Sequence, residues 1–276
     1  MLIMRTQPLI SIITPVYNGA DYLDALILSV LHQDYKNVEH IIIDDGSTDN
    51  GATVEILKKY PHLRWWSREN KGQYATLNEG LLAAQGDIIS IICADDVYVT
   101  PSAFSAVLEF WQHHPDAGCV YGDTLRMNQQ SQLLPLDPTL PKPPYSNWFI
   151  RHWLLILHCS LFVDKTVLHK HQLLFDLSLR YAGDWDWIIR LFQVTNFVYL
   201  NQSLSIYREH LNQTSQSTLK KTLALENLTV RQRYHSNALI YWLLIYKHRV
   251  LKSVWLIRSQ GISGFFQFFK QWLKNK

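Results

Sequence analysis

Residues 88–98 read Ile-Ile-Ser-Ile-Ile-Cys-Ala-Asp-Asp-Val-Tyr, an apolar run that ends on two adjacent carboxylates, Asp95 and Asp96. An isoleucine-rich run with few polar breaks is typical of a buried strand in a parallel sheet. Open α/β sheets bind ligands at the carboxyl ends of their strands, where the two acids would lie. Because adjacent carboxylates repel each other, the pair indicates a divalent metal shared with substrate phosphates. The structural alternative is a cap for a helix introduced by Pro101 and Ser102.

The hydrophobic pattern around this stretch alternates between strands and helices. We predict strands at residues 9–15, 38–43 and 63–66, and helices at 21–32, from about 49 towards 60, and at 73–84. This alternation over about one hundred residues predicts an α/β fold with a mostly parallel central sheet flanked by helices. Further along, helices are predicted at 102–113 and 184–192 and strands at 118–121 and 197–207. The polar, proline-rich residues 129–144 indicate a loop or partly mobile lid.

The composition indicates a large globular chain. It has 276 residues, of which 47% are hydrophobic, which is ample for a sizeable core. The three cysteines, Cys93, Cys119 and Cys159, lack the spacing of a metal site, and the N-terminus does not resemble a signal peptide. These features predict reduced thiols in a cytoplasmic protein. No apolar run reaches the roughly 18 residues that span a bilayer.

Charge is distributed unevenly along the chain. Glu226 is the last acidic residue, and nine Lys or Arg follow it, so the tail carries +9 and the first 226 residues sum to −6. On a helical wheel, residues 265–276 place Phe, Trp and Leu on one arc and Lys, Gln and Asn opposite. This pattern predicts a helix that lies in an anionic membrane surface. Burial of the same aromatics against the catalytic domain or a dimer partner is the alternative.

Five motifs occur in order, and each is weak alone. They are Ser-Ile-Ile-Thr-Pro-Val-Tyr-Asn at 11–18, Ile-Ile-Asp-Asp-Gly-Ser-Thr-Asp at 42–49, Asn-Lys-Gly at 70–72 with Asn78 and Gly86-Asp87, Ala-Asp-Asp at 94–96, and Gly-Asp-Trp-Asp at 183–186 with Arg190. Together they resemble the family 2 glycosyltransferases, which have the GT-A fold. The resemblance covers roughly residues 9–215. It predicts a catalytic domain at 1–225, with a nucleotide-binding half at about 1–100 and an acceptor half at about 101–225, and a helical tail at 226–276.

The resemblance implies a nucleotide site near the N-terminus of the chain. It places Thr14, Pro15, Tyr17 and Asp44 around the base of a nucleotide diphosphate sugar, with a UDP- or dTDP-sugar favoured. Tyr17 can stack on the base and Asp44 can accept a hydrogen bond, although a core aromatic and a turn residue are the structural alternatives. Lys71 resembles a basic residue near the nucleotide, and a solvated surface lysine is its alternative.

The family's metal motif often reads Asp-x-Asp, and Cys93 stands here where the first acid would be. A thiol is a soft, poor ligand for Mg2+. By resemblance we assign Asp95 to ribose or metal and Asp96 to metal, with Mn2+ or Mg2+ as the cofactor. His210, in the segment Tyr-Arg-Glu-His at 207–210, is a further candidate for holding the metal or diphosphate.

Asp184 matches the family's general base, which removes the proton of the acceptor hydroxyl. The usual preceding Glu is Gly183 here, and Asp186 is the second choice. In a helix, Asp184 and Asp186 would point to different sides. Arg190 can bind phosphate or pair with Asp186 at i,i+4. His158 could line the acceptor site, although a surface or core histidine is the plainer interpretation.

The resemblance therefore predicts an inverting, metal-dependent transferase. The Gln-x-x-Arg-Trp motif of processive synthases does not occur, so we expect addition of one sugar per encounter to a saccharide or lipid-linked acceptor. The expected process is cell-surface polysaccharide or glycolipid synthesis, in the cytoplasm or at the inner face of the membrane. No nucleic acid partner is expected, and a homodimer is compatible with the sequence. A nucleotidyltransferase is disfavoured because residues 14–19 contain one Gly and no Lys or Arg. A degenerate binding or scaffold subunit rests only on Cys93 and Gly183.

Overall fold

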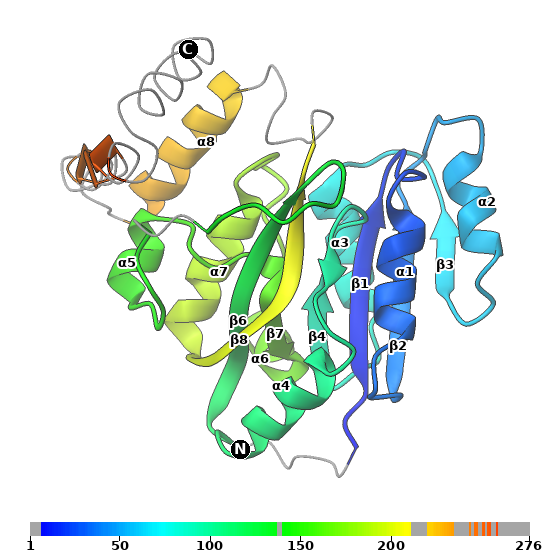
Figure 1. The fold of residues 1–276 in the computed structure, drawn as a ribbon, viewed down its shortest axis with the longest axis horizontal. Helices are drawn as coiled ribbons and strands as arrows, with labels where there is room; N and C mark the ends of the chain where they lie inside the picture. The colour runs from blue at the N-terminus through cyan, green and yellow to red at the C-terminus, as the bar shows by residue number, and fades with distance from the viewer. Residues whose placement is uncertain are drawn as a thin grey trace.

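The computed structural model describes residues 7–136, 140–210 and 220–234, with scattered positions between 243 and 258. The predicted membrane-facing segment 265–276 lies outside the described residues. In the described part, one sheet of 8 strands has the order β3-β2-β1-β4-β7-β6-β8-β5. Helices cover both faces of this curled sheet (Figure 1). The predicted α/β class is therefore confirmed.

The N-terminal half of the sheet is parallel. Its strands are β1 (Ile10–Val16), β2 (Val38–Asp44), β3 (Arg64–Ser67) and β4 (Ile88–Ile91). They alternate with α1 (Leu23–Leu31), α2 (Ala52–Lys58) and α3 (Gln73–Ala83). Each element agrees with its predicted range to within a few residues, because strand and helix periods are both clear in this part of the sequence.

The C-terminal half of the sheet is mixed. The strand β7 (Leu161–Asp164) runs antiparallel to both β4 and β6 (Ala117–Asn128), whereas β6 and β8 (Asn196–Glu209) are parallel. The short β5 (Val97–Tyr98) pairs antiparallel with β8. The sequence pattern does not predict β7, because three apolar residues followed by Asp164 give no measurable period. The predicted strand at 118–121 covers only the first part of β6.

The remaining elements complete the second half. They are α4 (Ala103–Gln112), α5 (Asn147–His152), the 3₁₀ turn η1 (His158–Ser160), α6 (Lys165–His171), α7 (Gly183–Val194) and α8 (Lys220–Arg233). The expected boundary between residues 225 and 226 falls inside α8. Figure 1 shows α8 beside α7, and the hydroxyl of Tyr234, just after α8, donates to Asp186 of α7 at 2.8 Å. No helix in the described part of the chain is long and apolar enough to cross a membrane.

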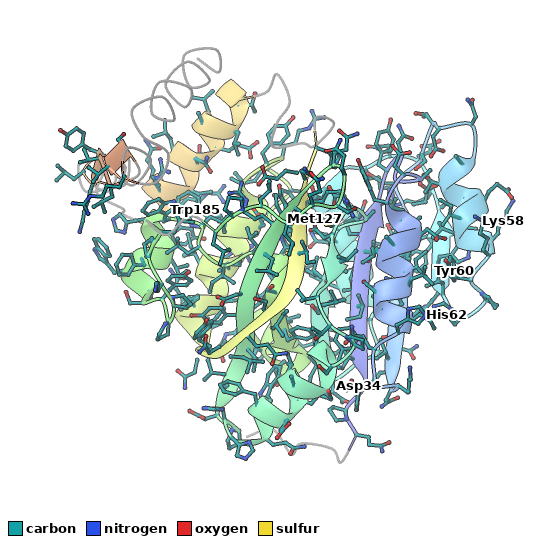
Figure 2. The ribbon with its side chains drawn as sticks, in the orientation of Figure 1. Asp34, Lys58, Tyr60, His62, Met127 and Trp185 are labelled. Carbon is teal, nitrogen blue, oxygen red and sulfur yellow. The ribbon has the colours of Figure 1, made fainter. Side chains whose placement is uncertain are left out.

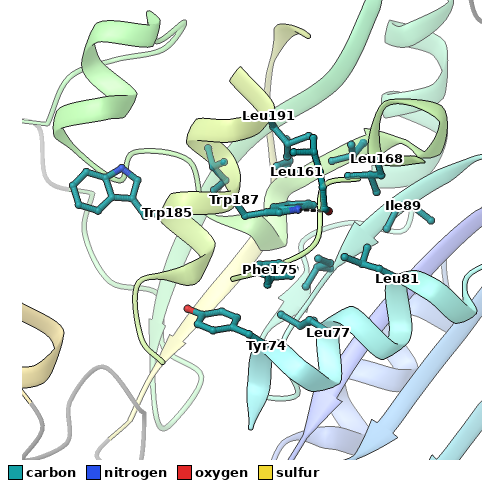
Figure 3. Close-up of a cluster of buried hydrophobic side chains, with 14 of the residues drawn as sticks. Tyr74, Leu77, Leu81, Ile89, Leu161, Leu168, Phe175, Trp185, Trp187 and Leu191 are labelled. Atoms are coloured by element: carbon teal, nitrogen blue, oxygen red, sulfur yellow. Dashed lines mark hydrogen bonds between the residues drawn. The ribbon is translucent and has the colours of Figure 1, made fainter. Parts of the chain in front are cut away.

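Side chains alternate between two cores, one on each face of the sheet. Along β1, Ile12 joins the core under α1 and α4, and Ile13 joins the core under α3 and α7. Both are fully buried, as the period of two in a strand requires. Figure 3 shows the second core, where Tyr74 of α3 approaches the rings of Phe175 and Trp187. This core fixes the start of α7 relative to the sheet.

The two acids of the opening stretch lie just past the carboxyl end of a strand, where the sequence pattern predicts them. Strand β4 ends at Ile91, so Asp95 and Asp96 lie beyond the strand, in the turn that leads into β5. They do not cap α4, whose N-cap is Ser102 and makes no side-chain cap bond. The carboxylates turn instead towards β8, as described next.

Candidate active site

Three potential metal ligands converge in the turn between β4 and β5. One ligand atom from each of Cys93, Asp95 and Asp96 lies within 4.8 Å of the others. Asp96 is 1% exposed; its Oδ1 accepts the backbone N–H of Arg208 at 3.0 Å, and its buried Oδ2 has no hydrogen-bond partner in the described part of the chain. Burial, and then the charge of Asp95, raise the pKa of Asp96 well above its ordinary value. A buried carboxylate oxygen without a partner, beside a second carboxylate, fits a hard divalent cation.

The end of β8 encloses these acids. His210 Nε2 lies 2.9 Å from Asp95 Oδ2, and Arg208 Nε donates to the backbone carbonyl of Asp95 at 2.9 Å. The Arg208 guanidinium also lies 4.6 Å from the ring centre of Tyr22, so it joins the acid turn to the loop before α1. The structure thus brings His210 beside the acids. The sequence reading singled out residues 207–210 and still missed Arg208, whose role depends on β8 lying next to β5.

Asp184 lies at the start of α7 with its two oxygens in different situations. Oδ1 accepts the backbone N–H of Trp185 at 2.8 Å and faces the Tyr74 hydroxyl at 3.4 Å. Oδ2 lies 3.9 Å from His158 Nδ1, and the Asp184 side chain is 20% exposed. Burial is the main cause that raises the pKa of Asp184, and it is opposed by the charge that His158 would carry when protonated. One oxygen is therefore held in place while the other can accept a proton.

His158 joins this carboxylate to the acid turn. Its Nε2 lies 3.4 Å from Cys93 Sγ, on the opposite side of the ring from the nitrogen that faces Asp184. Its Nδ1 is buried without a hydrogen-bond partner among the described residues, and burial lowers the pKa of His158. The sequence reading favoured a surface or core role for this histidine. Only the pairing of β7 with β4 places η1 between Cys93 and Asp184.

Gly183 departs from the family's usual Glu for a steric reason. A Cβ at this position would lie 2.6 Å from a ring carbon of Tyr74. The Tyr74 ring cannot move easily, because it is 6% exposed and stacks on Phe175 with ring centres 5.3 Å apart (Figure 3). Its hydroxyl also accepts the backbone N–H groups of Gly183 and Asp184 at 3.0 and 3.3 Å. Tyr74 thus occupies the space that a larger side chain would need, and it supports the backbone of Asp184.

We expect Gly183→Ala to lower sugar transfer by at least about tenfold and to destabilise the fold by about 1–3 kcal/mol, because the new methyl overpacks the Tyr74 ring. Turnover and thermal unfolding would be measured together. In a Tyr74→Ala background the ring is absent, so adding Gly183→Ala should cost little more. Equal losses in both backgrounds would contradict the steric explanation.

Asp186 belongs to a separate, buried network. It is 1% exposed, and its Oδ2 accepts from Arg190 Nε at 2.7 Å while its Oδ1 accepts from the Tyr234 hydroxyl at 2.8 Å. Asp184 and Asp186 therefore face different partners, which favours Asp184 as the base. The i,i+4 pairing considered for Arg190 is present, and its contact with phosphate stays a prediction.

The residues assigned to the base of the nucleotide lie at the carboxyl ends of β1 and β2. Thr14 and Pro15 are buried, and the Thr14 hydroxyl lies 3.1 Å from His40 Nε2. Asp44 is 1% exposed and accepts the backbone N–H of Ser47 at 3.1 Å, so it has the turn role that was its structural alternative. Tyr17 is 50% exposed and is the member of this group with a ring face available for stacking.

Lys71 lies on an exposed turn whose conformation is fixed by Asp45. The carboxylate of Asp45 accepts the backbone N–H groups of Lys71 and Gly72 at 2.8 and 2.9 Å, and it also pairs with Arg68. The lysine side chain is exposed. Its contact with a nucleotide stays a prediction, and the sequence reading missed that Asp45 orders this turn.

Three neighbouring parallel strands, β1, β2 and β4, thus bring these residues to one end of the sheet. Tyr17 follows β1, Asp44 ends β2, and the two acids Asp95 and Asp96 follow β4. The sequence profile described as Glycosyl transferase family 2 matches residues 11–155. The chain belongs to this family. It is accordingly a glycosyltransferase, as the motifs predicted, and the nucleotidyltransferase alternative is set aside.

Several relatives of this family 2 glycosyltransferase share most of its length. An uncharacterized glycosyltransferase of Rickettsia prowazekii is 31% identical over 228 residues, which cover 80% of this chain and 70% of the relative. Chondroitin synthase of Escherichia coli is 26% identical over 228 residues, which cover 81% of this chain and 32% of the synthase. The chain therefore spans about a third of that synthase.

Solved structures share its GT-A fold. S. aureus TarS in complex with UDP-GlcNAc has a TM-score of 0.63 at 19% identity, over 76% of this chain and 61% of that chain. A mannosyltransferase of Pyrobaculum calidifontis in complex with GDP-Man and Mn2+ has a TM-score of 0.62 at 14% identity, over 96% of this chain and 79% of that chain. The predicted fold of the family 2 glycosyltransferase is thus confirmed.

Proposed function

We propose that this glycosyltransferase moves one sugar from a nucleotide diphosphate sugar to an acceptor hydroxyl with inversion, and that Asp184 is the general base. The observation that carries the proposal is the placement of Asp184. Asp184 Oδ1 accepts a backbone hydrogen bond, and its Oδ2 can accept the proton of the acceptor. His158 lies between Asp184 and the cluster of Cys93, Asp95 and Asp96. The base and the acidic turn, which come from two halves of the fold, are therefore joined through the His158 ring.

The reaction is a single displacement at the anomeric carbon. The acceptor oxygen forms its bond to that carbon as the bond to the nucleoside diphosphate breaks, and the acceptor proton passes to Asp184 Oδ2. A base with a raised pKa suits this task, because efficient proton transfer requires a pKa closer to the working pH. Attack opposite the leaving group inverts the anomeric configuration.

Asp95 and Asp96 would hold Mn2+ or Mg2+, with His210 adjacent. The cation would supply charge neutralisation for the diphosphate oxygens as the leaving group departs. The buried Asp96 Oδ2, which has no hydrogen-bond partner among the described residues, supports this assignment, as does the Mn2+ named with the Pyrobaculum mannosyltransferase. Tyr17 offers its exposed ring to the base of the nucleotide, and UDP- and dTDP-sugars remain the favoured donors; the TarS complex with UDP-GlcNAc supports the former.

A saccharide or lipid-linked acceptor in polysaccharide or glycolipid synthesis is proposed from the motifs, and the similarity to chondroitin synthase supports a polysaccharide. Action at the inner face of a membrane through segment 265–276 stays a prediction, as do a cytoplasmic location and a homodimer. The degenerate-subunit alternative loses one support, because Tyr74 explains the absence of a larger side chain at Gly183.

A thermal-shift panel tests the proposal. The probes are UDP, dTDP, GDP and CDP and their common sugar derivatives, each with and without Mn2+. A selective ligand present at 100 times its Kd should stabilise the fold by about 2.7 kcal/mol, because it binds only the folded state. We expect one nucleotide to be selected and its effect to require Mn2+. Equal or absent shifts for all nucleotides would contradict the proposal.

A further inference from the structure

Glu226, the last acidic residue of the chain, contacts the segment that leads into the catalytic helix. Its carboxylate accepts three backbone N–H groups, from Arg180 at 3.0 Å, Tyr181 at 2.7 Å and Ala182 at 3.0 Å. These residues immediately precede α7, whose N-cap, Ala182, cannot supply a side-chain cap. A carboxylate near the start of a helix satisfies exposed N–H groups and interacts favourably with the helix dipole.

The other end of α8 holds the first turn of α7. The Tyr234 hydroxyl donates to Asp186 Oδ1 at 2.8 Å, and Arg233 Nη1 lies 3.3 Å from the same oxygen. Arg233 also pairs with Asp176 at 2.5 Å. The Arg231 guanidinium lies 5.2 Å from the ring centre of Trp185, which Figure 2 shows below α8. Contacts from α8 therefore reach the residues before and after Asp184.

Apolar burial contributes little to the attachment of α8. Leu225 is 64% exposed and Leu228 is 43% exposed, whereas Val230 is fully buried. The helix is held mainly by hydrogen bonds and ion pairs at defined positions on residues 176–186. Such contacts are directional, so they fix the orientation of the backbone that they bind.

We propose that α8 positions the catalytic base, with Glu226 as the main positioning residue. The inference rests on the proposed function, because it requires Asp184 to be the base. Glu226 acts on Asp184 through the backbone. It holds residues 180–182, just before α7, and Asp184 Oδ1 accepts the backbone N–H of Trp185 in the first turn of that helix. A displacement of about 1 Å in a reacting group can cost about 10²-fold in rate. The predicted tail at 226–276 thus begins within α8, a helix that positions the catalytic base.

The test is Glu226→Gln, which keeps the shape of the side chain and removes its charge and one of its two accepting oxygens. Turnover is followed as nucleoside diphosphate release, with Mn2+, from UDP-GlcNAc, UDP-glucose, dTDP-glucose and GDP-mannose. We expect kcat to fall by at least about tenfold, while the Kd of the nucleoside diphosphate changes by less than about twofold. Glu226→Asp, which restores the charge, should recover part of the loss. Gln232→Ala on the exposed side of α8 is the matched control and should behave as wild type.

A double-variant comparison separates positioning from a general effect on folding. In an Asp184→Asn background the base is absent, so Glu226→Gln should cause no further loss of the residual rate. Amide hydrogen exchange should rise at Arg180, Tyr181 and Ala182 in Glu226→Gln and stay unchanged in α4. A loss that is equally large in both backgrounds, or a wild-type kcat for Glu226→Gln, would overturn the inference.

The Asp184→Asn variant separates a failure of the proposed function from a failure of the role given to Glu226. Retained turnover in Asp184→Asn, or no release from any donor by the wild-type chain, would overturn the proposed function and this inference with it. An inactive Asp184→Asn together with a fully active Glu226→Gln would overturn the inference alone.

Discussion

Replacement of Asp184 by Asn is expected to lower the rate of sugar transfer by about 10²- to 10⁴-fold, the usual contribution of a general base. An amide cannot accept the acceptor proton at neutral pH. The Asn oxygen can still accept the Trp185 N–H, so the backbone should keep its place. Donor affinity, measured by calorimetry, should therefore stay at the wild-type value while single-turnover transfer is lost.

The pH dependence provides the control for this variant. Burial raises the pKa of Asp184, so wild-type kcat should fall on the acid side at a pH above the ordinary range of an Asp side chain. The residual rate of Asp184→Asn should lack that acid limb. Asp186→Asn should instead weaken thermal stability, because it disrupts the bonds to Arg190 and Tyr234. Transfer by Asp184→Asn within a few-fold of wild type would identify another group as the base.

Asp96→Asn is expected to weaken Mn2+-dependent binding of the nucleoside diphosphate by at least about tenfold. Loss of an outer-shell partner alone typically lowers metal affinity by about 10- to 100-fold, and loss of a direct ligand should cost no less. The variant removes the negative charge of the carboxylate, whose buried Oδ2 has no hydrogen-bond partner among the described residues. Asn can retain the bond from the Arg208 N–H, so the fold should persist. Calorimetry with and without Mn2+ measures the effect.

The matched control for Asp96→Asn is Asp164→Asn. Asp164 is also buried, at 3% exposure, but it caps α6 and pairs in register with Ile88, at the start of β4. It therefore lies near the start of β4, whereas Asp96 lies beyond the end of that strand. Asp164→Asn should affect stability and leave nucleotide binding intact. Equal affinity of Asp96→Asn and wild type in the presence of Mn2+ would remove Asp96 from the metal site.

Local patterns in the sequence determined the N-terminal half of the fold and the chemistry of its motifs. The strand and helix periods located β1 to β4 and their helices, since each period reflects neighbours along the chain. The same patterns placed Asp95 and Asp96 after a buried strand, and the resemblance selected Asp184 over Asp186. The exposed ring of Tyr17 agrees with its predicted stacking role, whereas Asp44 is engaged by its own turn.

Only the tertiary structure decided which distant residues complete the site. His158 lies between Cys93 and Asp184, Tyr74 fills the space beside Gly183, and Glu226 holds the approach to α7. These contacts join residues that are 26 to 109 positions apart in the sequence. Periodicity reports which face of an element is buried and carries no information about the partner on the other side. That partner is determined by strand order and helix packing, which is why η1, just before β7, and α8 supply site contacts that the sequence alone did not assign.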